Sequence, residues 1–304
     1  MSENRHDNSK LSLIKLSPRG LFQLTKPSIM LLVLISGMVS IFIEGSLINQ
    51  PRELIYLMLG LFLTGGCANS LNQYLERRID ARMSRTMARR PLPSGKISAR
   101  QALFFSLFIG ISGILLLGIR FNWATAALAL SIILFYGFFY TLWLKPRTPQ
   151  NIVIGGLAGA LVPVGTWMAV TETMSATPWL IALIIFLWTP PHFWCLAIYY
   201  REDYRRAGLP MMPLVRGEQG TLRMISIYVG LLFIASLVPI AVGFGVVYAL
   251  TALTMGTIYL MKTHDTRKKA SSNKIRSLFR YSIIYLLTVF FAMIIDGFFK
   301  LRII

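Results

Sequence analysis

The sequence has few charged residues and few cysteines, and both shortages narrow the class of protein. Only 14% of its 304 residues are Asp, Glu, Lys or Arg, about half of what is usual in a soluble domain. The two cysteines, Cys67 and Cys195, lie in apolar segments, which argues against a disulfide-stabilised fold and against a zinc cluster. The first 27 residues lack the apolar core of a signal peptide, and Glu3 and Asp7 argue against a mitochondrial presequence. Hydrophobic residues fill 55% of the chain instead, which predicts an integral membrane protein.

Nine apolar stretches have the length that a helix needs to cross a bilayer, roughly 20 residues. From Ile225 to Leu260 the chain is almost continuously apolar, and at ~1.5 Å per residue it would form a helix of about 54 Å. We therefore expect two spans there, joined by a hairpin at Gly243-Phe-Gly245. The predicted fold is all-α, with spans at about 28–47, 54–75, 101–119, 121–143, 151–170, 178–199, 224–242, 244–262 and 281–299.

The domain organisation follows from what lies between the spans. No solenoid repeat and no low-complexity linker is visible, so residues 28–304 are predicted to form a single transmembrane domain. Residues 1–27 are predicted to form a cytoplasmic N-terminal segment, in which Leu16–Leu24 has the composition of a short interfacial helix.

The distribution of basic residues predicts the orientation. The formal net charge of +19 would by itself suit a nucleic-acid-binding protein. With the N-terminus in the cytoplasm, only Arg52, Arg120, Lys300 and Arg302 fall in outer segments, and the other 27 of the 31 basic residues lie inside. Positive charge on the inner side predicts nine spans with the C-terminus outside, and it disfavours nucleic-acid binding because no single basic surface is formed. Asp296, near the outer end of the last span, is expected to be solvated at the interface.

The second span ends in a stripe of oxygen-bearing side chains. Asn72, Glu76 and Asp80 are spaced four residues apart and therefore lie along one face of a helix. Acidic side chains at a membrane boundary are costly, and two carboxylates with an amide suit Mg²⁺, which is usually shared with substrate phosphates. The nearby arginines either form anchoring salt bridges or make bidentate phosphate contacts. Phosphate contacts are the better interpretation for Arg85, Arg89 and Arg90.

The sixth span ends in a second group of polar residues. Pro190-Pro191 interrupts the helical hydrogen bonds, which is tolerated where a helix is buried or lines a cavity. His192 follows among aromatic residues, either as a satisfied core residue or as a polar contact in an aromatic pocket. Glu202-Asp203 repeats the combination of acids and arginines, and two such sites facing each other would hold two Mg²⁺ ions bridging one diphosphate.

Three basic residues in other inner segments are further candidates. Lys145 and Arg147 lie between the fourth and fifth spans, where they either contact a diphosphate or anchor the span end at the membrane surface. Lys26 opens the first span and is a weaker candidate for the same site.

These motifs resemble those of the UbiA-type intramembrane prenyltransferases. The run Asn72-Gln-Tyr-Leu-Glu76-Arg-Arg-Ile-Asp80 is similar to the family pattern N-x-x-x-D-x-x-x-D, with Glu76 in place of the middle aspartate. The continuation Met-x-Arg-Thr and Arg-Pro-Leu-Pro-x-Gly resembles the subgroup of protohaem IX farnesyltransferases, or haem O synthases. The string W-T-P-P-H-F-W, followed by R-E-D-Y-x-x-A-G-x-P-M-x-P, resembles that subgroup most specifically, although it departs from the wider family's second D-x-x-x-D motif. The resemblance covers about residues 25–221.

The resemblance implies a UbiA-type bundle that transfers the farnesyl group of farnesyl diphosphate to a vinyl group of haem b, forming haem O. It implies Mg²⁺ as cofactor, an active site toward the cytoplasmic face of a bacterial inner membrane, and a downstream haem-modifying enzyme or oxidase as a candidate partner. The implied catalytic residues are Asn72, Glu76, Asp80 and Asp203, with Glu202 as a further metal ligand. The implied substrate contacts are Lys26, Arg85, Arg89, Arg90, Lys145, Arg147, His192 and Tyr204.

Two alternatives remain at this stage. A UbiA-type enzyme that acts on a quinone or chlorin precursor would share the first motif, but it is not expected to carry the W-T-P-P-H-F-W string. A secondary transporter would also have about this many spans, but transporters place ionisable residues near the bilayer midplane. Here the acids lie at cytoplasmic helix ends, which disfavours transport.

Overall fold

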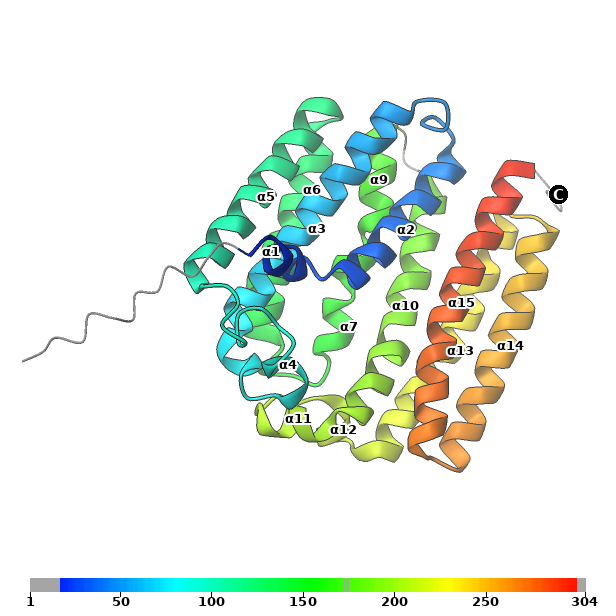
Figure 1. The fold of residues 1–304 in the computed structure, drawn as a ribbon. Coiled ribbons are helices and arrows are strands. Elements are labelled where there is room, and N and C mark those ends of the chain that lie inside the picture. Colours follow the sequence, from blue (N-terminus) through cyan, green and yellow to red (C-terminus); the bar gives the residue numbers. More distant parts are fainter. Residues whose placement is uncertain (1–16, 172, 174, 300–304) are drawn as a thin grey trace, which may run out of the picture.

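The computed structural model describes residues 17–171, 173 and 175–299 (Figure 1). Within these residues nine helical spans are long and apolar enough to cross a membrane, which confirms the predicted all-α architecture. Most of the predicted N-terminal segment, residues 1–16, lies outside the described residues, as do Lys300 and Arg302. The orientation and the division into a segment and one domain therefore stay predictions.

The spans begin and end close to the predicted boundaries. In order they are α2 (Pro27–Glu44), α3 (Pro51–Asp80), α5 (Ala99–Arg120), α6 with the π-helix η1 (Trp123–Leu134 and Phe135–Leu144), α7 to α9 (Asn151–Gly155, Leu157–Ala160 and Val162–Val170), α10 (Ala176–Tyr199), α13 (Gly217–Ala241), α14 (Val246–Lys268) and α15 (Ser272–Phe299). The short helices outside the spans are α1 (Pro18–Leu24), α4 (Ser84–Met87), α11 (Arg201–Arg206) and α12 (Met212–Val215). Helix α1 confirms the short helix predicted before the first span, and Figure 1 shows α4, α11 and α12 together at one end of the bundle.

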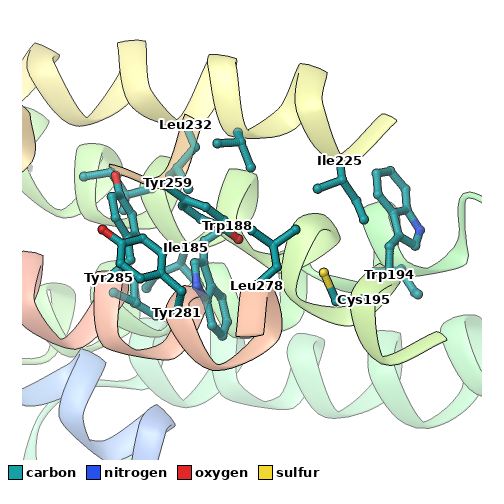
Figure 2. Close-up of a cluster of buried hydrophobic side chains, with 14 of the residues drawn as sticks. Ile185, Trp188, Trp194, Cys195, Ile225, Leu232, Tyr259, Leu278, Tyr281 and Tyr285 are labelled. Carbon is teal, nitrogen blue, oxygen red and sulfur yellow. The ribbon is translucent and has the colours of Figure 1, made fainter. Parts of the chain in front are cut away.

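The core lies between α10 and the last three spans. Helix α10 is the most buried of the nine spans, and its side chains pack against those of α13, α14 and α15. Figure 2 shows Trp188 of α10 among buried side chains of these helices, including Leu232, Tyr259 and Tyr285. Large apolar side chains such as Phe104 remain exposed on the outer surfaces of the helices, as expected where lipid replaces water as the solvent.

The hairpin predicted between the seventh and eighth spans is confirmed. Helix α13 ends at Ala241 and α14 begins at Val246, and Gly243 takes a φ of 96° in the turn. Because this left-handed conformation is strained for residues with a Cβ atom, glycine suits the position.

Asp296 differs from its predicted solvated state. It is only 5% exposed, and its Oδ2 accepts a hydrogen bond of 2.8 Å from the backbone N–H of Tyr248 in the first turn of α14. The first N–H groups of a helix have no acceptor within that helix, so the Asp296 carboxylate of α15 supplies one from a neighbouring span. The residue therefore joins the hairpin to the last span.

Replacing Asp296 with alanine is expected to lower the free energy of unfolding by about 1–2 kcal/mol, the usual cost of losing a helix-capping side chain. Thermal unfolding of the purified protein in detergent measures the change. Asp296→Asn keeps an acceptor oxygen and is expected to lose less. The matched control is Asp265→Ala, which removes only an ion pair with Lys274 at the surface. Equal destabilisation by the Asp296 and Asp265 substitutions would contradict the capping role.

Candidate active site

The three side chains of the predicted acidic stripe lie together and are buried. Asn72, Glu76 and Asp80 occupy the last turns of α3, and each is only 2% exposed. Buried carboxylates require partners, because an isolated charge is costly to remove from water. The partners here are basic side chains from three other parts of the chain.

Lys26, Arg90 and Lys145, which were predicted as substrate contacts, all reach this stripe. The Nζ of Lys26 donates to Oδ1 of Asn72 at 2.8 Å. Lys145 forms an ion pair with Oε1 of Glu76. The Nη1 of Arg90 contacts Oδ2 of Asp80 and lies 3.6 Å from Oε2 of Glu76, so one guanidinium bridges the two acids. Of the two neighbouring arginines, Arg90 contacts the acids of the stripe, whereas Arg89 is exposed.

Lys26 is held in an unusual backbone conformation. It precedes Pro27, the first residue of α2, and among the described residues it is the only non-glycine residue with a positive φ, at 54°. A residue with a Cβ atom rarely adopts this backbone conformation. Backbone strain of this kind is often found at functional sites. Burial, followed by the positive charge of Arg90, lowers the pKa of Lys26 to about 7. Because an anion beside an amine favours its charged form, a ligand phosphate would raise this pKa again.

Lys145 behaves differently because it has a carboxylate partner. Burial alone would lower the pKa of Lys145, but the charge of Glu76 and its hydrogen bond outweigh burial and raise that pKa above its ordinary value. Lys145 therefore remains protonated and supplies a lasting positive charge at the stripe.

A π-helix, which the sequence analysis missed, positions two of these contacts. Within η1 the hydroxyl of Thr141 donates to the backbone oxygen of Tyr136, five residues earlier, at 2.7 Å. The same hydroxyl accepts a hydrogen bond of 3.0 Å from Nδ2 of Asn72, which leaves Oδ1 of Asn72 facing Lys26. Lys145 follows η1 directly. Segments of π-helix are uncommon and are often found at functional sites.

Asn151 is a second residue that the sequence analysis did not select. It is fully buried at the start of α7, and its Nδ2 donates to the backbone oxygen of Thr148 at 2.5 Å and lies 3.5 Å from that of Lys145. Its Oδ1 has no hydrogen-bond partner among the described residues. A buried acceptor without a partner is uncommon, so Asn151 adds an oxygen donor beside Lys145.

Asp203 joins α11 to the loop that follows α3. Its Oδ1 accepts hydrogen bonds from the Ser84 hydroxyl at 2.6 Å and from the Ser84 N–H at 3.2 Å, and its Oδ2 accepts from the Arg85 N–H at 3.1 Å. Burial opposes ionisation, but these hydrogen bonds outweigh it and hold the pKa of Asp203 below its ordinary value. Both oxygens of Asp203 thus contact the first turn of α4 and set the position of Arg85.

Arg85 and Arg89 line a cleft between two inner loops, the loop that follows α3 and the loop that follows α10. The cleft has a volume of about 270 Å³, and its other lining residues come from α4 and from the region where α10 meets α11. The guanidinium of Arg85 lies over the rings of Tyr200 and Tyr204, at 4.8 and 5.7 Å, and donates to the Tyr204 hydroxyl at 3.4 Å. The cleft therefore combines two arginines with two acids, Glu202 and Asp203, and with tyrosine rings.

Glu202 and Arg147 are not brought to the acidic stripe. Glu202 is exposed and forms an ion pair of 2.5 Å with Arg205, one turn later on α11. Arg147 is exposed as well and donates to the backbone oxygens of Leu142 and Trp143. Asp203, which follows Glu202, and Lys145, two residues before Arg147, are directed inward instead, because nearby positions on a helix or turn point in different directions.

His192 lies in an aromatic pocket formed by α10 and α15. Its ring stacks between those of Trp188 and Phe279, with ring centres 4.4 and 4.5 Å away, and its Nδ1 lies 2.7 Å from the hydroxyl oxygen of Ser282. Phe193 meets the ring edge-on. The packing among aromatic rings and the hydrogen bond to Ser282 match the interpretation of His192 as a satisfied core residue, and a contact with the substrate stays a prediction.

The donors at the stripe fit Mg²⁺. Among the described residues no group of three or more His, Cys, Asp and Glu side chains is placed to hold a metal ion. The stripe offers one amide oxygen and two carboxylates, a set of hard oxygen donors too small to enclose a cation. Mg²⁺ prefers such sites, since it keeps several positions for water and for phosphate oxygens.

Comparison with known proteins agrees with the fold. The model of the UbiA prenyltransferase family matches residues 33–291. The protoheme IX farnesyltransferase of Erythrobacter litoralis is 41% identical over 284 residues, which cover 91% of this chain and 92% of that protein. The protoheme IX farnesyltransferase of Gloeobacter violaceus is 43% identical over 285 residues, with coverage of 91% and 92%.

Solved structures share the fold at low sequence identity. A digeranylgeranylglyceryl phosphate synthase superposes with a TM-score of 0.76 at 20% identity, covering 92% of this chain and 98% of the other. A UbiA homologue from Archaeoglobus fulgidus bound to GPP and Mg²⁺ superposes with a TM-score of 0.68 at 16% identity, covering 90% and 99%. With nine spans, an acidic stripe at a helix end and a family match across most of its length, this multi-pass membrane protein belongs to the UbiA prenyltransferase family.

Proposed function

We propose that this protein transfers the farnesyl group of farnesyl diphosphate to a vinyl group of haem b, forming haem O and releasing diphosphate. The observation that carries the proposal is the convergence of Lys26, Arg90 and Lys145 on the stripe of Asn72, Glu76 and Asp80. The relatives named protoheme IX farnesyltransferase, about 40% identical over more than 90% of this chain, support haem as the acceptor. The product would serve haem O and haem A biosynthesis for terminal oxidases.

Asn72, Glu76 and Asp80 would hold Mg²⁺, which when bound neutralises the diphosphate and makes it a better leaving group. Archaeal UbiA homologues bound to DMAPP or GPP together with Mg²⁺ support this assignment. Asp203 would act through α4, since its hydrogen bonds position Arg85 beside the same loop.

The basic side chains that pair with the stripe in the ligand-free protein can also bind the diphosphate. Three basic groups face only two carboxylates, so the stripe has more cationic than anionic partners. Lys26, Arg90 and Lys145 can move from the side chains of the stripe to phosphate oxygens, where they stabilise the charge that develops as the diphosphate departs. Arg85 would contact the diphosphate from the cleft between the inner loops, and Arg89, which is exposed at the rim of that cleft, would contribute a weaker contact.

The reaction then proceeds at the allylic carbon of the farnesyl group. Its C–O bond breaks with both electrons passing to the diphosphate, and the allylic carbon forms a bond with the terminal vinyl carbon of haem b. Water adds to the adjacent vinyl carbon and a proton is lost, which leaves a hydroxyethylfarnesyl group. The apolar spans surround the farnesyl chain and exclude water until the carbon–carbon bond has formed.

The proposed location is a bacterial cytoplasmic membrane, with the site toward the cytoplasmic face. The inner-loop helices α4, α11 and α12 lie at one end of the bundle, where the predicted inner loops concentrate the basic residues (Figure 1). His192 would contact the porphyrin, and a downstream haem-modifying enzyme or oxidase would receive the product.

The direct test supplies purified protein with haem b, farnesyl diphosphate and Mg²⁺ and analyses the pigment by mass spectrometry. Haem O is the expected product, and chelation of Mg²⁺ with EDTA is expected to abolish its formation. Parallel reactions with a quinone precursor or a chlorin as the acceptor test the alternative within the family. A folded protein that leaves haem b unchanged, or that prenylates only the quinone or chlorin, would overturn the proposal.

A further inference from the structure

Ser282 of α15 has all of its polar groups engaged at the pocket of His192. The residue is fully buried, and its backbone oxygen accepts a hydrogen bond of 2.6 Å from Nε1 of Trp188. Its hydroxyl donates to the backbone oxygen of Phe279, one turn earlier, at 2.6 Å. Trp188 and Phe279 are also the two residues whose rings enclose the imidazole of His192. Ser282 is therefore fixed by the walls of the pocket.

The hydrogen bonds of Ser282 favour one tautomer of His192. The single hydroxyl proton of Ser282 is used by the Phe279 oxygen, so its oxygen can only accept from His192. The atom 2.7 Å away, Nδ1 of His192, must then carry a proton and donate it. In a neutral imidazole with a protonated Nδ1, the lone pair lies on Nε2.

The Nε2 of His192 is left without a protein partner. Among the described residues no hydrogen bond to this atom is present, and His192 as a whole is 9% exposed. A neutral histidine whose Nδ1–H is held by an oxygen acceptor is the usual arrangement of an imidazole that binds a metal through Nε2. Haem iron is commonly held by such a histidine.

We infer that Ser282 is a positioning residue for haem: it holds His192 with a protonated Nδ1, so that Nε2 can bind the iron of the haem substrate. The inference rests on the proposed function, because haem is the acceptor there. Stacking between Trp188 and Phe279 sets the plane of the ring, and Ser282 sets which nitrogen is free. Together they define one direction of approach for the iron.

The experiment adds haem b to the purified protein without farnesyl diphosphate, so that binding is read independently of the transfer reaction. Wild-type protein is expected to show a histidine-ligated haem in its absorption spectrum, with an iron–histidine stretch in the resonance Raman spectrum of the ferrous form. His192→Ala is expected to lose both signals, and added imidazole is expected to restore the ligated absorption spectrum. Ser282→Ala is expected to keep the ligand but to weaken haem binding by roughly 10- to 100-fold, the usual effect of losing a hydrogen bond to a ligating histidine.

Two further variants separate positioning from general stability. Ser282→Thr keeps a hydroxyl at the same place and is expected to restore both affinity and the iron–histidine stretch. Ser236→Ala is the matched control, because Ser236 is also fully buried and hydrogen-bonded, to Tyr285 and to the Leu232 oxygen, and makes no contact with His192. This control is expected to leave the spectrum unchanged even if it lowers the unfolding temperature.

The outcomes distinguish the inference from the proposed function. Wild-type protein that makes haem O but shows no iron–histidine stretch would overturn the role of His192 and Ser282 alone. An unshifted stretch and unchanged affinity in folded Ser282→Ala would overturn the role of Ser282. If Ser282→Ala does not fold, the wild-type Raman spectrum still tests the role of His192, and Ser282→Thr still tests the role of Ser282. Histidine-ligated haem that is never farnesylated would instead contradict the proposed function.

Discussion

Replacing Asp80 with alanine is expected to lower kcat/KM for farnesyl diphosphate by roughly 10²- to 10³-fold, the usual loss when one charged group that stabilises a transition state is removed. The variant deletes one of only two carboxylates at the stripe. It also leaves Arg90 without its closest anionic partner in a buried site. The loss of the carboxylate weakens the binding of a metal–diphosphate complex, and the unpaired Arg90 lowers the stability of the ligand-free protein. Initial rates of haem O formation over a range of Mg²⁺ concentrations measure the loss, and the concentration of Mg²⁺ needed for half-maximal rate is expected to rise.

Glu202→Ala provides the matched control for this prediction. Glu202 is also an acid in an inner loop, but it is exposed and contacts only Arg205 in an ion pair that is worth little at a surface. Its removal is expected to leave the rate within about twofold of the wild type, as for most changes of exposed ion pairs. The absorption spectrum with haem alone checks that both variants are folded. Equal losses in the two variants would contradict the assignment of the metal site to α3.

Arg90→Gln is expected to lower kcat/KM for farnesyl diphosphate by about 100-fold, because it removes a preorganised cation from the developing charge of the leaving group. Among the described residues, Arg90 is the one arginine with ion pairs to both Glu76 and Asp80. Without it, two carboxylates would remain close together with less compensating charge, so the ligand-free protein is expected to be less stable as well. Steady-state kinetics and thermal unfolding in detergent measure these effects.

Arg89→Gln is the matched control for Arg90→Gln, because the two arginines are adjacent in the sequence. Arg89 is exposed at the rim of the cleft between the inner loops, and Arg89→Gln is expected to change kcat/KM by only a few-fold. Arg90→Lys keeps the charge but loses the planar fork that bridges two acids, so its rate should fall between those of Arg90→Gln and the wild type. A larger loss for Arg89→Gln than for Arg90→Gln would show that the cleft, and not the stripe, binds the diphosphate.

The regular parts of the molecule were predictable because they depend on local patterns. Long apolar runs predicted the spans, Gly243 marked the hairpin, and the spacing of Asn72, Glu76 and Asp80 placed three donors on one face of α3. Each of these inferences uses only the periodicity of a helix or the thickness of a bilayer. Specific strings of residues, such as the run through His192, then pointed to the family.

The contacts of the site were not predictable, because they join residues far apart in the chain. The position of Asp296 near a span end predicts solvation, but burial against the start of α14 gives it a capping role. The π-helix that places Thr141 beside Asn72 leaves no clear periodic signal in an aromatic and apolar segment. Nor does spacing show that Ser282 lies across from His192, since 90 residues separate them.

The amino-acid sequence therefore contains the spans, the acidic stripe and the family motifs, since these follow from hydrophobicity and from residues a few positions apart. The partner of each charge depends on tertiary packing. Arg89 and Arg90 are identical in chemistry and adjacent in sequence, and Glu202 and Asp203 are adjacent carboxylic acids. One member of each pair faces solvent and the other is directed inward, because the turns after α3 and α10 direct successive side chains to different sides.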